Sequence, residues 1–86
     1  MTKAAELRKA ILAADCVQLS MKDGYGTTKW GKRLDFSDTV NETPKEIKSL
    51  YTDRGKCVKY TCVFSDKSKL IYTYNTRHNQ YKLVAK

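Results

Sequence analysis

The last third of the chain carries a cluster of basic residues. Such a cluster is what binding to several phosphate groups requires. Residues 54–86 contain eight Lys or Arg side chains and one acid, whereas residues 1–53 contain nine basic and eight acidic side chains. Clustered cations bind a phosphate backbone strongly, because each contact releases condensed counterions. Since phosphate contacts do not read base sequence, we expect binding of low sequence specificity. The predicted phosphate contacts are Lys59, Lys67, Lys69, Arg77 and Lys82.

Residues 22–33 form a second group, in which glycines, aromatic rings and cations alternate. A flexible loop of this composition can follow a single-stranded nucleic acid by stacking on its bases and contacting its phosphates. The phosphate-loop pattern G-x-x-x-x-G-K-[ST] is absent, and two glycines one residue apart are a weak signal. Trp30 shares strand parity with Leu34 and Phe36, which favours a place in the core and makes the stacking residues conditional. The predicted contributors are Lys29, Lys32, Arg33, Tyr25 and Trp30.

His78, the only histidine, lies in a predicted loop before the last strand. Residues 70–84 resemble the end of the microbial ribonucleases of the barnase type, in which a histidine before the last strand serves as general acid. The resemblance implies that His78 and Arg77 take part in RNA cleavage. That family also places a glutamate on a sheet strand as general base, and no glutamate of this chain is expected on a strand. Acid–base cleavage needs two groups within reach of one ribose, so we expect a non-enzymatic protein and keep a ribonuclease as an alternative.

The three cysteines do not suggest a disulfide framework or a metal site. An odd count in a short chain argues against paired cysteines. Cys57 and Cys62 are five residues apart, so on one regular strand they face opposite sides of a sheet. Buried free thiols are the common outcome for such residues. The acids and the single histidine lack metal-ligand spacing, and we therefore expect no metal and no cofactor.

Three C-terminal strands are predicted to carry the basic surface. β-branched and aromatic residues dominate residues 57–65, 70–75 and 81–84, and turn-forming residues separate these runs. The opposite, outer face shows lysines among Thr, Ile and Val, and lacks the rings of a base-stacking platform. If the two faces are exchanged, the tyrosines lie outside and form such a platform. The core face is predicted to contain Val58, Tyr60, Cys62, Phe64, Leu70, Tyr72, Tyr74, Tyr81 and Leu83.

The first part of the chain is predicted to supply a helix and two strands. Residues 3–14 favour a helix, because apolar residues recur at spacings of three and four after Thr2, a suitable N-cap. Residues 16–22 alternate as a strand with one solvent-exposed face. A turn at residues 23–26 then leads to a second strand over residues 29–36.

Residues 43–55 are predicted to form a second helix. Thr43 fits the N-cap, Pro44 the first helical position and Glu46 the capping box. The apolar stripe of this helix would consist of Ile47, Leu50 and Tyr51. The helix would end at a glycine, residue 55.

These elements give the order α-β-β-α-β-β-β, an α+β domain with an antiparallel sheet and both helices on one face. A chain of 86 residues makes a single domain, residues 1–86, and buries roughly 60–65% of its unfolded surface. No apolar run approaches the ~20 residues of a membrane-spanning helix, and the N-terminus lacks the core of a signal peptide. We therefore expect a cytoplasmic protein that does not bind membranes.

The sequence predicts a small basic protein that binds nucleic acid, DNA or RNA, through its C-terminal sheet. The alternative is a protein-binding inhibitor or regulator of the phage or mobile-element type, which docks on a larger acidic host protein. Charge does not separate the two, because an acidic protein would use the same surface through electrostatic steering. The sequence leaves the oligomeric state open.

Overall fold

The computed structural model describes residues 1–86. The helices are α1 (Lys3–Ala13) and α2 (Phe36–Val40). A three-stranded antiparallel sheet in the order β1-β2-β3 consists of β1 (Cys16–Ser20), β2 (Tyr25–Thr28) and β3 (Arg33–Asp35). A four-stranded antiparallel sheet in the order β4-β5-β6-β7 consists of β4 (Lys45–Tyr51), β5 (Cys57–Val63), β6 (Lys69–Asn75) and β7 (Gln80–Ala85).

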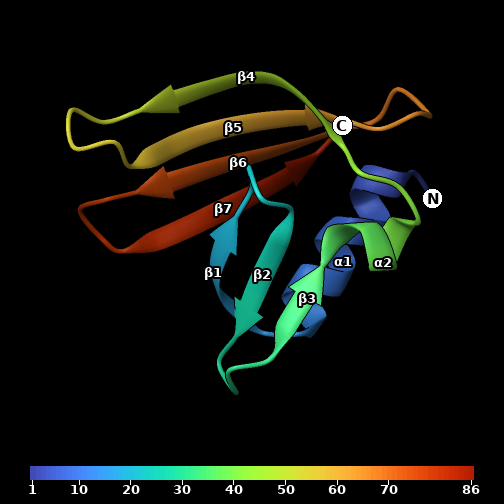
Figure 1. Cartoon of the computed structure of the whole chain (residues 1–86), viewed down its shortest axis with the longest axis horizontal. Helices are drawn as coiled ribbons and strands as arrows, with labels where there is room; N and C mark the ends of the chain where they lie inside the picture. The colour runs from blue at the N-terminus through green and yellow to red at the C-terminus, as the bar shows by residue number, and fades with distance from the viewer.

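Both sheets and both helices contribute to one core. In Figure 1 the larger sheet lies across the top, the smaller sheet lies below β7, and the two helices lie to the right. The β4–β5 and β6–β7 turns project at the left end of the larger sheet, whereas the β5–β6 turn lies at its right end, near the N-terminus. Thirteen buried residues, drawn from the helices, both sheets and the segments between them, form a single hydrophobic cluster.

Helix α1 confirms the sequence prediction. Thr2 is extended, and its hydroxyl accepts a hydrogen bond from the Ala5 amide at 3.2 Å, which caps the helix. Ala4, Leu7 and Ile11 share one face and are fully buried. This face packs against β6 and β7, so α1 closes the core on the inner face of the larger sheet.

Strands β5, β6 and β7 confirm the three predicted C-terminal strands, and the two faces are not exchanged. The buried residues of these strands are Tyr60, Cys62, Leu70, Tyr72 and Leu83. A register shift against β4 leaves Val58 as an extra residue of β5, which is a β-bulge. Consequently Cys57 packs against the core in place of Val58. The prediction that Cys57 and Cys62 face opposite sides is therefore wrong, and all three thiols are free.

The helix predicted for residues 43–55 is wrong, because residues 45–51 form β4, an edge strand of the larger sheet. The expected buried stripe, Ile47, Leu50 and Tyr51, is 54%, 57% and 44% exposed. A capping pattern is a local signal, and pairing with the strongly β-forming β5 overrides it. Gly55, with a φ of +78°, belongs to the β4–β5 turn. Positive φ serves a hairpin as well as a helix C-terminus, so this glycine did not distinguish the two structures.

The strand predicted over residues 29–36 is shorter and begins later. Strand β2 already occupies residues 25–28, so the turns fall at residues 21–24 and 29–32. Gly31 has a φ of +80° in the β2–β3 turn, and the neighbouring Trp30 is 74% exposed, not buried. The buried ring is that of Phe36, which begins the short α2 that the sequence analysis did not predict.

The α+β class with antiparallel strands is confirmed. The order of elements is α-β-β-β-α-β-β-β-β, and two sheets take the place of the single predicted sheet. Neither helix has the length and apolar character that a membrane crossing requires.

Candidate functional site

The outer face of the larger sheet is a basic surface. Antiparallel partners point to the same side of a sheet, so strand pairing defines three rows of side chains across this face. The rows are Lys45, Val63, Lys69 and Lys86; Lys48, Thr61, Ile71 and Val84; and Leu50, Lys59, Thr73 and Lys82. We call these residues the lysine face.

The lysine face carries six lysines and no acidic side chain. All six lysines are exposed, and none takes part in an ion pair. Three acids close to this sheet lie away from the lysine face. Glu46 is opposite Cys62 in the β4–β5 register, which places it on the inner face. Glu42 and Asp66 bind Lys3 at the start of α1. Unpaired charges of one sign raise the local potential, so this face attracts anions.

The centre of the lysine face is apolar but not aromatic. Val63, Ile71 and Val84 are half-buried, and Leu50 at the β4 edge is 57% exposed. Without rings the face offers no platform for stacked bases. Its chemistry therefore suits contacts with a backbone of phosphates.

The structure brings together part of the predicted phosphate contacts. Lys67, with a φ of +69°, lies in the β5–β6 turn, and Arg77 lies in the β6–β7 turn, at opposite ends of the sheet. The predicted residues on the lysine face are Lys59, Lys69 and Lys82. The lysines that the sequence analysis did not assign to this face are Lys45, Lys48 and Lys86.

The cations predicted in the loop 22–33 lie on the smaller sheet, and two of them are paired. The Lys29 ammonium lies 3.4 Å from the Asp15 carboxylate. The Arg33 guanidinium lies 2.8 Å from Asp35, and this hydrogen bond raises the pKa of Arg33 above its ordinary value. Lys32 is exposed and makes no ion pair. This group is thus separate from the lysine face.

The two rings of the same loop already have cations beside them. The Arg33 guanidinium lies 4.0 Å from the Tyr25 ring centroid, and Lys29 Nζ lies 5.0 Å from the Trp30 ring centroid. Trp30 stands in the β2–β3 turn, at the foot of Figure 1, far from β4 and β5. Tyr25 lines a cleft between the two sheets.

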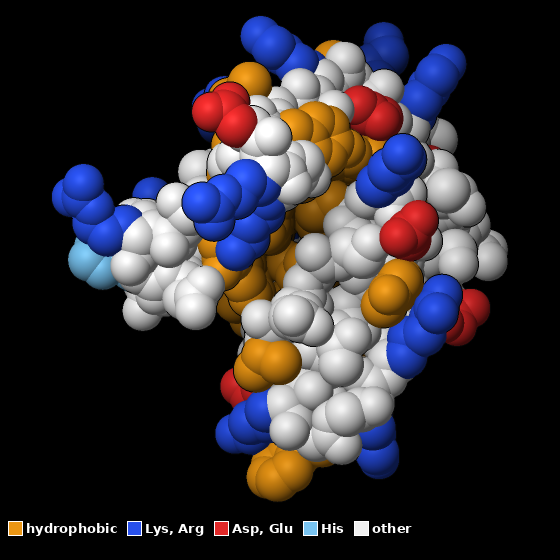
Figure 2. All heavy atoms as spheres, turned by 60° about the vertical axis from the view of Figure 1, so that its left-hand side comes forward, with side chains coloured by type: hydrophobic (Ala, Val, Ile, Leu, Met, Phe, Trp, Pro, Cys, Tyr) orange, Lys and Arg blue, Asp and Glu red, His pale blue; other side chains and the backbone are white.

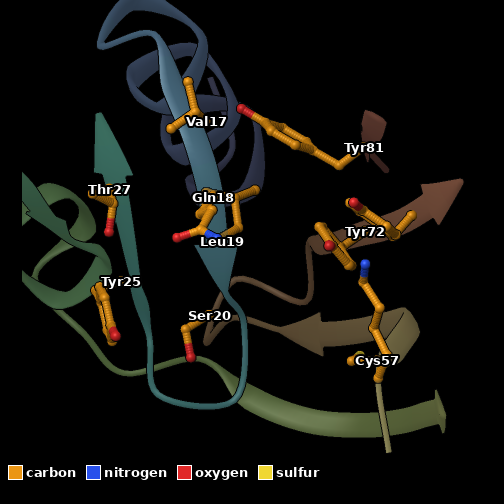
Figure 3. A pocket seen from close by; sticks show the side chains of 11 residues that line it. Val17, Gln18, Leu19, Ser20, Tyr25, Thr27, Cys57, Tyr72 and Tyr81 are labelled. Atoms are coloured by element: carbon orange, nitrogen blue, oxygen red, sulfur yellow. The ribbon is translucent and has the colours of Figure 1, made fainter. Parts of the chain in front are cut away.

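This cleft has a volume of about 290 Å³. One wall is formed by β1 and β2, and the other by the inner faces of β6 and β7 with the start of β5 (Figure 3). Figure 2 shows the hollow lined by hydrophobic side chains, with Lys and Arg side chains on its rim. A second hollow of about 270 Å³ shares Cys57 and Tyr72 with it and continues toward Tyr51. We call the first hollow the tyrosine cleft, after Tyr25, Tyr72, Tyr74 and Tyr81.

Three tyrosines of the larger sheet form an aromatic layer in the tyrosine cleft. The Tyr72 ring centroid lies 6.4 Å from that of Tyr74 and 6.1 Å from that of Tyr81. The Tyr74 hydroxyl donates to Asn79 Oδ1, and the Tyr81 hydroxyl donates to the Cys16 carbonyl on β1. The Tyr72 hydroxyl has no protein partner, and no unpartnered polar side-chain atom is fully buried. It therefore reaches the open cleft.

The wall of the tyrosine cleft is neutral except for one cation. Burial raises the pKa of Tyr72 to about 12, and it also raises the pKa of Tyr81 and of the Cys57 thiol. The cation is Lys56, whose Nζ lies 4.2 Å from the Tyr74 ring centroid. The cleft thus combines ring surface, protonated hydroxyls and one positive charge.

His78 and Glu46 do not form an acid–base pair. His78 is exposed in the β6–β7 turn, where its amide donates to Asn75 Oδ1. Glu46 does lie on a strand, contrary to the sequence prediction, but it sits beside Cys62 at the other end of the sheet. The length of β6 between the two ends corresponds to about 17 Å. No three His, Cys, Asp or Glu side chains lie close enough together to hold a metal ion.

Sequence reasoning missed the tyrosine cleft, although one signal was present. Tyrosines occupy three of the predicted core positions of β6 and β7, and a tyrosine usually keeps its hydroxyl near solvent or a partner. Three such residues on one inner face indicate that this face is incompletely covered. The β1 wall of the cleft has no comparable signal in the sequence.

Comparison with known proteins found no relative: the chain matches no protein-family model, no curated protein and no solved structure.

Proposed function

We propose that the protein binds nucleic acid, DNA or RNA, through the lysine face, with low sequence specificity. The observation that carries the proposal is a sheet face with six exposed lysines and no acidic side chain. Lysine stems are long and flexible, so ammonium groups of neighbouring rows can reach different phosphates of one backbone. Each contact releases counterions and adds to the affinity.

The chemistry of the lysine face supports binding without base readout and without catalysis. Lysine contacts a phosphate as a point charge and lacks the planar fork with which arginine reads guanine. The face presents threonine and aliphatic side chains between the lysines, and no group on it is placed to transfer a proton. We also place the protein inside the cell, because free thiols such as its three cysteines persist in reducing compartments.

The proposal predicts a steep dependence of affinity on salt. Labelled single- and double-stranded DNA and RNA are titrated with the protein between about 50 and 200 mM salt. Six phosphate contacts give a slope of roughly −4 to −5 in a plot of log affinity against log salt concentration. An affinity that hardly changes with salt would remove the lysine face as a phosphate-binding surface.

A pair of double variants tests which lysines are responsible. Lys59→Ala/Lys82→Ala removes two charges from one row of the lysine face, and we expect the slope to become shallower by about 1.5. The control, Lys9→Ala/Lys22→Ala, removes the same charge from exposed sites on α1 and the β1–β2 turn. It should leave the slope unchanged. Equal changes in both variants would mean that net charge, and not this face, governs binding.

A second candidate function is docking on an acidic protein, and β4 is the observation that favours it. This edge strand exposes Leu50 on the lysine face and also exposes Ile47 and Tyr51. An exposed strand edge with apolar side chains can accept a further strand from a partner. A stoichiometric partner that survives nuclease treatment in a pull-down, and is lost with Ile47→Lys, would favour this function. A partner lost on nuclease treatment would favour nucleic acid.

A further inference from the structure

The tyrosine cleft has a polar wall that the lysine face lacks. Strand β1 is an edge strand of its sheet, and Val17, Gln18, Leu19 and Ser20 line the cleft. In an antiparallel strand every second residue turns its N–H and C=O to the same side. The free edge of β1 therefore offers backbone donors and acceptors. The hydrogen bond from the Tyr81 hydroxyl to the Cys16 carbonyl shows that this edge faces the larger sheet.

The aromatic wall is held in place and leaves one hydroxyl free. The hydroxyls of Tyr74 and Tyr81 are occupied by protein partners, which fixes the orientation of both rings. Ring surface is then what these two residues present to a ligand. Tyr72, which is only 6% exposed, directs its unpartnered hydroxyl into the same space. A ligand that fits has a flat ring and a polar edge.

We propose that the tyrosine cleft binds one unpaired base of a single-stranded nucleic acid, with Lys56 contacting the adjoining phosphate. A base stacks on aromatic side chains through its ring. Its Watson–Crick edge carries donors and acceptors that match the free edge of β1 and the Tyr72 hydroxyl. The volume of about 290 Å³ lies just below the usual range for ligand pockets, roughly 300–1,000 Å³, which suits a single ring system.

This inference rests on the proposed nucleic-acid function and adds a preference for single strands. A base in a duplex is stacked and paired, so it enters a pocket only after it is extruded. The β4–β5 and β6–β7 turns project at one end of the larger sheet, which carries the lysine face on one side and the aromatic wall of the cleft on the other (Figure 1). Each turn carries an exposed cation, Arg54 and Arg77 respectively. A strand whose phosphates lie on the lysine face can pass these turns to reach the cleft.

The first test compares two variants that leave the charge unchanged. Tyr74→Leu removes a ring from the cleft, and Leu12→Ala truncates an exposed apolar side chain on α1. With a 12-nucleotide oligothymidylate, Tyr74→Leu should lose at least about fivefold in affinity, the effect of one stacked base. Its affinity for a duplex of the same length should stay within twofold. Leu12→Ala should match the parent protein with both ligands.

The second test uses the parent protein, so it does not depend on the folding of a variant. Cys57 lines the cleft and is half-buried, whereas Cys16 and Cys62 are 5% and 1% exposed. Alkylation of the folded protein therefore reports on Cys57, and Cys57→Ser confirms the assignment. Oligothymidylate should slow the alkylation, whereas the duplex and oligoglutamate should not.

The outcomes separate this inference from the proposed function. Salt-dependent binding that is equal for single strands and duplexes, with no protection of Cys57, overturns the cleft and leaves the lysine face in place. Protection by oligoglutamate alone assigns the cleft to a peptide and overturns its assignment to a base. Loss of single-strand affinity in Tyr74→Leu but not in Lys59→Ala/Lys82→Ala supports the cleft and contradicts the lysine face. If no nucleic acid binds at any salt concentration, both are wrong.

Discussion

At the scale of single residues, Asp66 connects the β5–β6 turn to the start of α1. The Lys3 amide donates to Asp66 Oδ2 at 2.9 Å, and the Ser68 amide donates to Asp66 Oδ1 at 3.0 Å. Ser68 Oγ in turn accepts from the Ala4 amide at 3.1 Å. The β5–β6 turn thus satisfies two amides of the first turn of α1, where a carboxylate is also favoured by the helix dipole.

The state of Asp66 predicts a specific acid sensitivity. The Ser68 hydroxyl, followed by the amides of Lys3 and Ser68, lowers the pKa of Asp66 from its ordinary 3.8 to about 2. Because the folded-state pKa is the lower one, this carboxylate stabilises the protein above pH 3.8, and its contribution is lost as the pH falls toward 2. Asp66→Asn should lower the free energy of unfolding at pH 7 and flatten its decline below pH 4. Urea unfolding as a function of pH measures both effects.

The matched control for Asp66 is Asp53→Asn in the β4–β5 turn. Asp53 is exposed and forms no ion pair, so this variant should follow the parent protein at every pH. Glu42, whose pKa is lowered chiefly by its bond to Lys3, keeps some acid sensitivity in Asp66→Asn. Identical pH profiles of Asp66→Asn and the parent protein would show that the turn does not hold α1.

Phe36 is the ring on which the core depends most. It is completely buried, whereas Trp30 is 74% exposed. Phe36→Ala should cost about 3–5 kcal/mol in the free energy of unfolding, a large part of the total for a domain of this size. Trp30→Ala should stay within about 0.5 kcal/mol of the parent protein. Urea unfolding at pH 7 measures the free energy of unfolding of both variants. Similar decreases in the two would contradict the assignment of Phe36 as the buried ring.

At the scale of elements, β4 shows how a tertiary contact overrides local sequence. Thr43, Pro44 and Glu46 have the types and spacing of a helix start. Residues 45–51 nevertheless pair with β5, which gives the larger sheet its fourth strand and leaves most β4 side chains exposed. The bulges within this pairing and the lysines on the strand limit uncontrolled edge-to-edge association.

Ile47 distinguishes the strand from the predicted helix. In β4 this side chain is 54% exposed, so Ile47→Lys should change the free energy of unfolding by no more than about 0.5 kcal/mol. In a helix packed on the core, the same change would bury an unpaired charge and unfold the protein. Ile11→Lys, at a fully buried position of α1, is the control that should unfold it. Circular dichroism and urea unfolding of both variants give the answer.

The elements that were predicted correctly are those whose pattern repeats over many residues. Helix α1 and strands β5 to β7 each carry a periodic apolar face and clear boundary residues, and all four are confirmed. The short α2 offers only Phe36 and Val40 as buried residues, too few for a periodicity. Trp30 shared the parity of a core residue, but it lies beside Gly31 in the β2–β3 turn and not on a strand. Local pattern does not reveal such breaks.

The candidate sites were predictable to the extent that they follow from strand parity. Alternation correctly placed Lys59 and Lys82 opposite the tyrosines. It did not show how far the smaller sheet and α1 cover the inner face, which decides whether a tyrosine is sealed or lines a cleft. It also could not add Lys45 and Lys48, because their strand was taken for a helix.

At the scale of the whole molecule, the fold concentrates charge more than the sequence does. The first 53 residues are nearly balanced in charge, yet Lys45 and Lys48 from this part join the lysine face through the pairing of β4 with β5. Glu42 and Asp66 bind Lys3 at the start of α1, and Glu46 lies on the inner face. One side of the protein is therefore strongly basic, and the salt dependence of affinity tests whether this side contacts phosphates.

The contacts of α1 and β1 with β7 also constrain when the protein can fold. Arg8 binds the Leu83 carbonyl across 75 residues, and Tyr81 binds the Cys16 carbonyl across 65. During synthesis α1 emerges before the strands that bury it, so its apolar face stays uncovered until β7 has left the ribosome. Structures built on such distant pairings fold slowly. A nascent chain halted before residue 80 should remain open to proteases, and a chain whose residues 80–86 have also left the ribosome should resist them.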